Sequence, residues 1–228
     1  MWKLKFAPDW DSAADELNKA AVCFRVGQSW AQAKAAHLRA AEAFANNGNL
    51  YHAGKQLDQA MNIVRDLGQL EEVEQLASRG AGLYRQAGSP ESAAQLLVRA
   101  AKLLEPKDPA LSVSLYQKAA DTVGTEDRSA EAGQHLEQAA RLCVRTGDYD
   151  RAAELLEAAL SCYASAPSAV SAISTPYGRV VLAFVLVQER RGDCVAASKV
   201  RETCRDANRL IGEVVQSRRR PLLGSSPC

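Results

Sequence analysis

Residues 91–101 read Glu-Ser-Ala-Ala-Gln-Leu-Leu-Val-Arg-Ala-Ala, and three other stretches of the chain have the same pattern. These stretches are residues 11–21, 51–61 and 130–140. An alanine shared by all four copies recurs at nearly equal intervals, at Ala20, Ala60, Ala100 and Ala139. A fixed period of this length is typical of stacked structural repeats, and it predicts a solenoid rather than a globule.

Three further positions recur after each copy with nearly the same spacing, and the residues at one such position in the four copies form a column. The three columns contain Ala33, Val73, Ser112 and Ala152, then Ala40, Gly80, Ala119 and Ala159, then Phe44, Tyr84, Val123 and Tyr163. Small residues seven apart, with a large apolar residue four positions further on, form one face of a helix. Turn residues such as Asn46-Asn-Gly-Asn and Thr146-Gly-Asp separate the helices. Each unit is therefore predicted to be an antiparallel helix pair, with these columns in its core.

The predicted fold class is all-α, a right-handed superhelical solenoid of helix pairs like those of tetratricopeptide (TPR) proteins, with repeats of about 40 residues. Three segments are expected. Residues 1–8 form a basic and aromatic N-terminal segment, and residues 9–208 form the solenoid, with four units over 9–163 and a fifth pair over 177–208. Residues 209–228 form a basic tail, rich in Pro, Ser and Gly, with no capacity to build a core.

Composition excludes several classes of function. Lys and Arg number 28 against 27 Asp and Glu, so the net charge of +1 gives no overall attraction to nucleic acid. The longest apolar run, residues 180–187, is far shorter than the roughly 20 residues that a membrane helix needs. No signal peptide is recognisable. We expect a cytoplasmic protein that is neither secreted nor membrane-spanning.

The sequence also lacks patterns for catalysis or metal binding. Six cysteines lie far apart without a Cys-x-x-Cys pair, so they are interpreted as reduced thiols. His37, His52 and His135 are expected on or near exposed helix faces, as surface histidines or as histidines with a satisfied hydrogen bond. No phosphate-binding glycine loop or catalytic constellation occurs. We expect no enzyme activity, no cofactor, no metal site and no small-molecule substrate.

Two basic features stand out from this background. Arg39, Arg79 and Lys118 each precede a residue of the small-residue column and recur once per repeat, so stacking is expected to align them on one surface. We call these three residues the basic ridge. The alternative is that they are three solvated charges on amphipathic helices. The second feature is the N-terminal tip, which could lie at a lipid headgroup boundary or be a frayed end, and it consists of Trp2, Lys3, Leu4, Lys5 and Phe6.

Particular strings go beyond a generic helical repeat. They are Pro8-Asp-Trp-Asp-Ser-Ala-Ala14, residues 46–53 (Asn-Asn-Gly-Asn-Leu-Tyr-His-Ala), residues 108–119 (Asp-Pro-Ala-Leu-Ser-Val-Ser-Leu-Tyr-Gln-Lys-Ala) and residues 139–145 (Ala-Ala-Arg-Leu-Cys-Val-Arg) followed by Tyr149-Asp150. In order and spacing they resemble the soluble NSF attachment protein (SNAP) family, and its gamma branch most closely. The resemblance covers roughly residues 2–204.

This resemblance implies a non-catalytic adaptor for vesicle-mediated transport and membrane fusion. Members of the family bind assembled, syntaxin-containing SNARE helical bundles and recruit the ATPase NSF, which takes the bundle apart. It further implies that basic residues of one face, here the basic ridge, meet the acidic bundle. The N-terminal tip would touch the membrane, giving peripheral attachment on the cytoplasmic side.

The chain also departs from the family pattern. Gln95 and Gln134 stand where alpha-type members tend to have lysine, and the family's leading helix and acidic C-terminal end are not recognisable. We therefore expect the solenoid fold and some binding to SNAREs or to a scaffold to be retained, and stimulation of NSF to be weak. The competing hypothesis is a generic TPR-like scaffold that binds short peptides without an ATPase partner.

Overall fold

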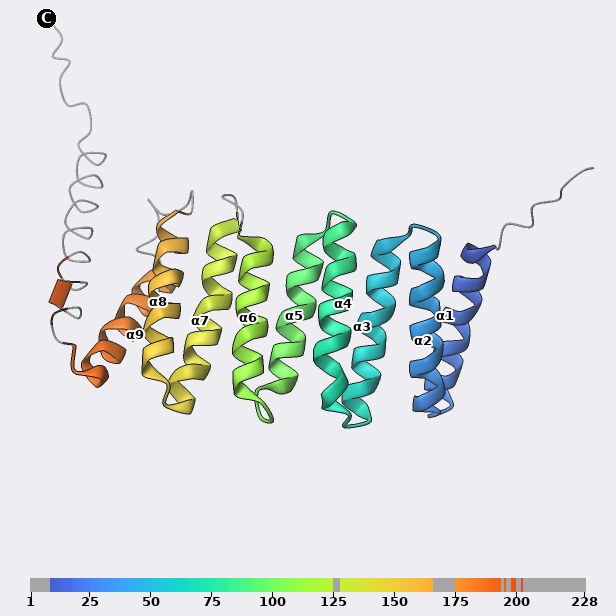
Figure 1. Cartoon of the computed structure of the whole chain (residues 1–228), viewed down its shortest axis with the longest axis horizontal. Coiled ribbons are helices and arrows are strands. Elements are labelled where there is room, and N and C mark those ends of the chain that lie inside the picture. The colour runs from blue at the N-terminus through green and yellow to red at the C-terminus, as the bar shows by residue number, and fades with distance from the viewer. Residues whose placement is uncertain are drawn as a thin grey trace, which may run out of the picture. The chain divides into compact units, whose positions relative to one another are not determined.

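The structure is a computed structural model that describes residues 9–124, 128–165 and 175–193, together with Val195, Ser198, Lys199 and Glu202. Within these residues the secondary structure is helical, with no strand. The chain divides into two compact units, residues 1–123 and residues 124–228. This confirms the predicted all-α class, and each unit consists of helices stacked in chain order (Figure 1).

The first unit contains three antiparallel helix pairs. Their helices are α1 (Trp10–Val26) with α2 (Trp30–Asn46), α3 (Leu50–Asp66) with α4 (Val73–Gln86), and α5 (Pro90–Leu104) with α6 (Pro109–Val123). A short 3₁₀ turn, η1 (Leu70–Glu72), precedes α4. Each helix packs on the next, and α3 also contacts α5, so the first helices of successive pairs form one layer.

The second unit contains α7 (Ser129–Thr146), α8 (Tyr149–Ala164) and α9 (Thr175–Arg191). The pair α7 and α8 is the fourth predicted unit, and α9 packs mainly on α8. The predicted fifth pair begins with α9, while most of its second half lies outside the described residues.

The columns deduced from the repeat period form the core. In all three second-helix columns, which begin with Ala33, Ala40 and Phe44, all four residues are buried. The first-helix alanines Ala60, Ala100 and Ala139 are also buried, whereas Ala20 is only half-buried because α1 has no preceding described helix to cover it. Alanine at most of these positions lets the helix backbones approach closely.

The turns within and between pairs share one geometry. Gly48, Gly88 and Gly147 have φ of 74°, 75° and 83°, a left-handed conformation that glycine adopts without steric cost. The next residue then donates its backbone N–H to a carbonyl of the preceding helix, as from Asn49 to Phe44 at 2.9 Å. In the first turn the residue with positive φ is Gln28, at 58°. Side-chain caps begin several helices, for example Asp148, which accepts from the backbone N–H of Arg151 at 3.1 Å.

Candidate interaction surfaces

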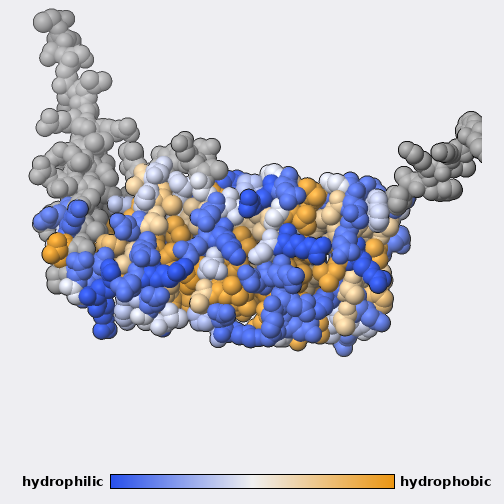
Figure 2. Space-filling view, viewed as in Figure 1, coloured by the Kyte–Doolittle hydropathy of each residue, from blue (hydrophilic) through white to orange (hydrophobic). Residues whose placement is uncertain are grey.

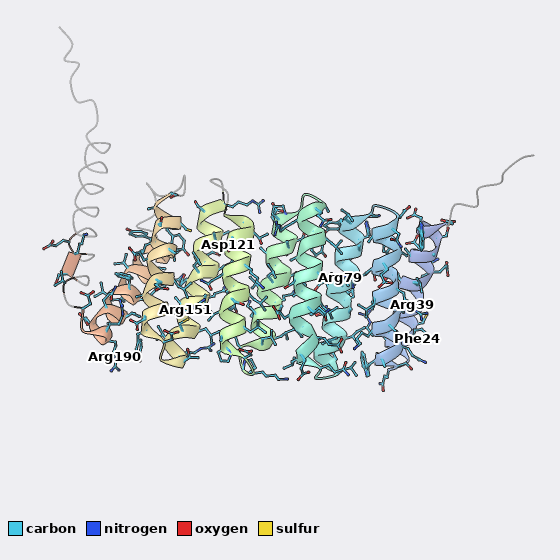
Figure 3. The ribbon with its side chains drawn as sticks, in the orientation of Figure 1. Phe24, Arg39, Arg79, Asp121, Arg151 and Arg190 are labelled. Carbon is cyan, nitrogen blue, oxygen red and sulfur yellow. The ribbon has the colours of Figure 1, made fainter. Side chains whose placement is uncertain are left out.

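The basic ridge lies on the second helices of the three pairs in the first unit. Arg39 is on α2, Arg79 on α4 and Lys118 on α6, and all three side chains are exposed. Each directly precedes a buried small residue, so the helical repeat fixes its outward direction. Figure 3 labels Arg39 and Arg79 on their helices. The residues therefore occupy equivalent places on α2, α4 and α6.

Two of these cations already have partners on the neighbouring second helix. Arg79 Nη2 lies 3.9 Å from Glu42 Oε1 of α2, and Lys118 Nζ lies 3.6 Å from Glu74 Oε1 of α4. All four side chains are between 43% and 61% exposed. Exposed pairs of this kind contribute only about 0–1 kcal/mol each, so a stronger partner can displace them. No ion pair involves Arg39 within the described residues.

The surface around the basic ridge carries charges of both signs. Its carboxylates are Glu42 on α2, Glu74 on α4 and Asp121 on α6, of which Asp121 is labelled in Figure 3. Three cations and three carboxylates give no net charge. Figure 2 accordingly shows hydrophilic residues over this face, with hydrophobic ones between them. Such a mixed surface favours an oriented partner with complementary charges over non-specific attraction of any polyanion. Its role in binding stays a prediction.

The second predicted feature, the N-terminal tip of Trp2, Lys3, Leu4, Lys5 and Phe6, lies outside the described residues. Among the residues that are described, no helix is both long enough and apolar enough to cross a membrane.

The structure also reveals ion pairs between helices of successive repeats that the sequence analysis missed. In the first unit, Lys34 Nζ of α2 lies 2.9 Å from Glu72 Oε1, and Arg99 Nη2 of α5 lies 2.6 Å from Asp58 Oδ2 of α3. In the second unit, Arg191 Nε lies 2.7 Å from Asp150 Oδ1. The partners are 38 to 41 residues apart. Opposite charges about one repeat apart are the sequence signal that could have indicated them.

The expectation for the histidines was wrong in two cases. His37 and His135 are buried, at 2% and 9% exposed, and only His52 lies on the surface. His37 was misassigned because its helix, α2, is covered on two sides, by α1 and by α3. Cys23, Cys143 and Cys162 are free thiols. Within the described ranges, no group of three or more His, Cys, Asp or Glu side chains is placed to hold a metal ion.

Stacked helix pairs with charged outer positions define a helical-repeat protein of the kind that presents an extended surface to a macromolecular partner. Sequence comparison specifies this class further. The model of the family described as "Soluble NSF attachment protein, SNAP" matches residues 7–199. The chain therefore belongs to the soluble NSF attachment protein family.

Two curated relatives are gamma-soluble NSF attachment proteins. The one from Dictyostelium discoideum is 28% identical over 152 residues, which are 67% of this chain and 47% of the relative. The one from Arabidopsis thaliana is 25% identical over 128 residues, 56% of this chain and 44% of the relative. The matched part thus spans less than half the length of these relatives.

Among solved structures, BtubC (BKLC) from P. vanneervenii aligns over 97% of this chain and 98% of that chain, with a TM-score of 0.43 and 12% identity. The fold assignment itself rests on the helices of this chain and on their packing.

Proposed function

We propose that this chain is a non-catalytic adaptor that binds assembled SNARE helical bundles and brings the ATPase NSF to them. It would act on the cytoplasmic side of membranes, with peripheral attachment through its N-terminal tip. The observation that carries the proposal is the family match over residues 7–199, which covers all of the described helices α1–α9. The names of the relatives supply the link to NSF, and the family resemblance supplies the link to SNAREs.

The basic ridge is the part of the surface that we assign to the bundle. Arg39, Arg79 and Lys118 recur once per repeat, so they can meet successive turns of a helical partner that lies across α2, α4 and α6. Their competing carboxylates, Glu42 and Glu74, are exposed and only loosely paired. An acidic bundle would replace these two carboxylates as the partners of Arg79 and Lys118.

The experiment compares affinity for an assembled four-helix SNARE complex at several salt concentrations. Reversing Arg39, Arg79 and Lys118 to Glu should weaken binding by about tenfold or more, since each exposed charge contributes up to about 1 kcal/mol. A control reverses three exposed cations elsewhere in the first unit, Arg65, Arg85 and Lys102, and should bind nearly as well as the natural chain.

Two further substitutions remove negative charge beside the basic ridge and should have the opposite effect on affinity. Glu42→Gln and Glu74→Gln together should strengthen binding by about twofold to fivefold, because they release Arg79 and Lys118 from their present partners. Equal affinities for the natural chain, the reversed ridge and the glutamine variant, at every salt concentration, would remove the basic ridge from the proposal.

A further inference from the structure

A groove of about 360 Å³ lies between α1 and α3, with side chains of α2 at its base. Its wall on α1 runs from Asp15 to Arg25, about 15 Å along the helix. The lining includes amide side chains, which can pair with free backbone N–H and C=O groups; an extended segment has such groups, whereas those of a helix pair internally. An extended chain rises about 3.3 Å per residue, so four or five extended residues match the groove in length.

The repeat explains why this groove is open. Asn18 and Gln59 line it, and their equivalents one repeat later are Asp58 and Arg99. Arg99 and Asp58 form an ion pair of 2.6 Å that links α3 to α5. In the first repeat the same two places have the amides of Asn18 and Gln59, and neither side chain forms a hydrogen bond with a described residue. The gap between α1 and α3 is thus left unbridged, with two amide groups at its rim.

A buried hydrogen bond presets a donor inside the groove. His37 Nδ1 lies 2.7 Å from Gln56 Oε1, and both residues line the groove although they are only 2% and 4% exposed. A carbonyl oxygen can only accept, so the bond fixes the orientation of the Gln56 amide. Its NH₂ group then points away from His37 and forms no hydrogen bond with a described residue, while His37 Nε2 is itself buried without a partner among them. A nearly buried amide donor is thereby held ready for an acceptor.

The charged side chains of the groove also favour an acceptor. Lys55 of α3 and Arg25 of α1 line it, and neither forms an ion pair with a described residue. Asp15 is the one carboxylate among the lining residues. The two cations outnumber this single carboxylate, so the lining has an excess of positive charge and a ligand with an acidic group fits best.

We propose that the groove between α1 and α3 binds an extended peptide segment of four or five residues through an Asp or Glu side chain. Lys55 and Arg25 attract the carboxylate, Gln56 donates to it, and Asn18 and Gln59 pair with the peptide backbone. This surface is separate from the basic ridge, which lies on α2, α4 and α6. It would add a short linear partner to the adaptor role proposed above, and it does not depend on that role.

The test titrates the isotope-labelled chain with acetylated and amidated peptides and follows NMR chemical shifts. The probes are Ser-Ala-Glu-Ala-Ser and its versions with Gln or Lys at the centre. The Glu peptide should bind at least about fivefold more tightly than the Lys peptide, and residues of α1 and α3 should shift. One further probe is the Gln peptide with free termini, whose only carboxylate is at its C-terminus. If it binds more tightly than the capped Glu peptide, the assignment to a side chain is overturned.

Variants of the chain make the test specific. Lys55→Gln should weaken the Glu peptide by about threefold to fivefold. Gln56→Glu keeps an oxygen for His37 Nδ1 but replaces the donor by a carboxylate, and it should weaken the Glu peptide by about tenfold or more. Lys102→Gln, an exposed lysine of α5 outside the groove, is the matched control and should change nothing.

Preference for Glu that is lost with Lys55→Gln and kept with Lys102→Gln supports the proposal, even if Gln56→Glu does not fold. Equal binding of the Glu, Gln and Lys peptides, or shifts confined to α4–α6, would overturn it. Because the basic ridge is untouched by these variants, binding to an assembled helical bundle should persist whichever result is obtained.

Discussion

Glycine at positions 54 and 133 is explained by the size of the side chain that faces it. A Cβ atom at Gly54 would lie 3.2 Å from ring carbons of Tyr84, and one at Gly133 would lie 3.0 Å from the ring of Tyr163. In each helix pair, the first helix has glycine at the position that faces the tyrosine ring of the second helix, because a larger residue would leave too little space for the ring. Where the facing residue is Phe44 instead, the equivalent position 14 has alanine, and the two are in one core cluster.

This packing predicts opposite effects for two glycine-to-alanine changes. Gly54→Ala should lower the free energy of unfolding by about 1 kcal/mol, because the added methyl group requires the buried, closely packed Tyr84 ring to shift by a few tenths of an ångström. Gly82→Ala is the control, since nothing lies within 4 Å of its Cβ, and alanine favours a helix by about 0.5–1 kcal/mol. Urea unfolding followed by circular dichroism measures both. Equal stability of the two variants would show that the Tyr84 ring does not restrict the size of the side chain at position 54.

His37 gives the fold a pH dependence. Burial lowers the pKa of His37, and the charge of Arg25 adds to this, while the hydrogen bond with Gln56 opposes it. The unfolded chain, with a histidine pKa near 6.5, therefore takes up the proton at a higher pH than the folded chain does. The stability due to neutral His37 is therefore fully present above the unfolded pKa, and it is lost as the pH falls through the folded pKa.

His37→Gln should accordingly flatten the pH dependence of stability between pH 7.5 and pH 5. The variant can still form an amide hydrogen bond with Gln56, and it has no proton to take up on unfolding. His52→Gln, at the exposed histidine of α3, is the control. Urea midpoints at both pH values give the comparison, and an equal loss of stability in acid for the two variants would contradict the role of His37.

At the scale of elements, one ion pair connects α3 to α5. Asp58 is 8% exposed and bonds to Arg99 at 2.6 Å, while its other oxygen is buried without a hydrogen-bond partner. Burial raises the pKa of Asp58, and Arg99 offsets this only in part. A folded-state pKa above the unfolded value means that protonation favours folding, and this stability is lost as the pH rises through the folded pKa.

The neutral variant Asp58→Asn should therefore keep or slightly raise the free energy of unfolding at pH 7. Arg99→Gln should lower it by about 1–3 kcal/mol, because the Asp58 charge is then left buried without compensation. The double variant should recover most of this loss. A thermodynamic cycle of the four chains measures the coupling, and a loss for Asp58→Asn as large as that for Arg99→Gln would contradict the account.

The elements themselves could largely be predicted from the sequence. The repeat period determined the helix pairs and the buried columns, because a helix must turn the same face inward in every repeat. The 3₁₀ turn at residues 70–72 was not foreseen, since a single turn has no periodicity to detect. Two features were not predicted from the sequence: the ion pairs between repeats and the groove between α1 and α3. A long side chain can reach several partners, and the packing of the helices determines which partner it contacts.

At the scale of the whole molecule, the sequence predicted a surface for a partner and not a catalytic centre. The columns of the period predicted equivalent places for Arg39, Arg79 and Lys118, and in the structure all three are exposed on second helices. The nearby carboxylates of Glu42 and Glu74 come from other positions of the repeat, so the column of cations alone does not predict them. They make the surface mixed in charge, which favours a partner of defined shape.

We propose that this chain recognises an assembled helical bundle and not its separate components. The most direct test measures binding of the chain to an assembled four-helix SNARE complex and, separately, to each unassembled component at the same concentrations. We predict binding of the assembled complex that is at least tenfold tighter than binding of any component, because only the bundle presents charges to α2, α4 and α6 at once. Equal affinity for the components, or no binding of the complex, would contradict the adaptor assignment.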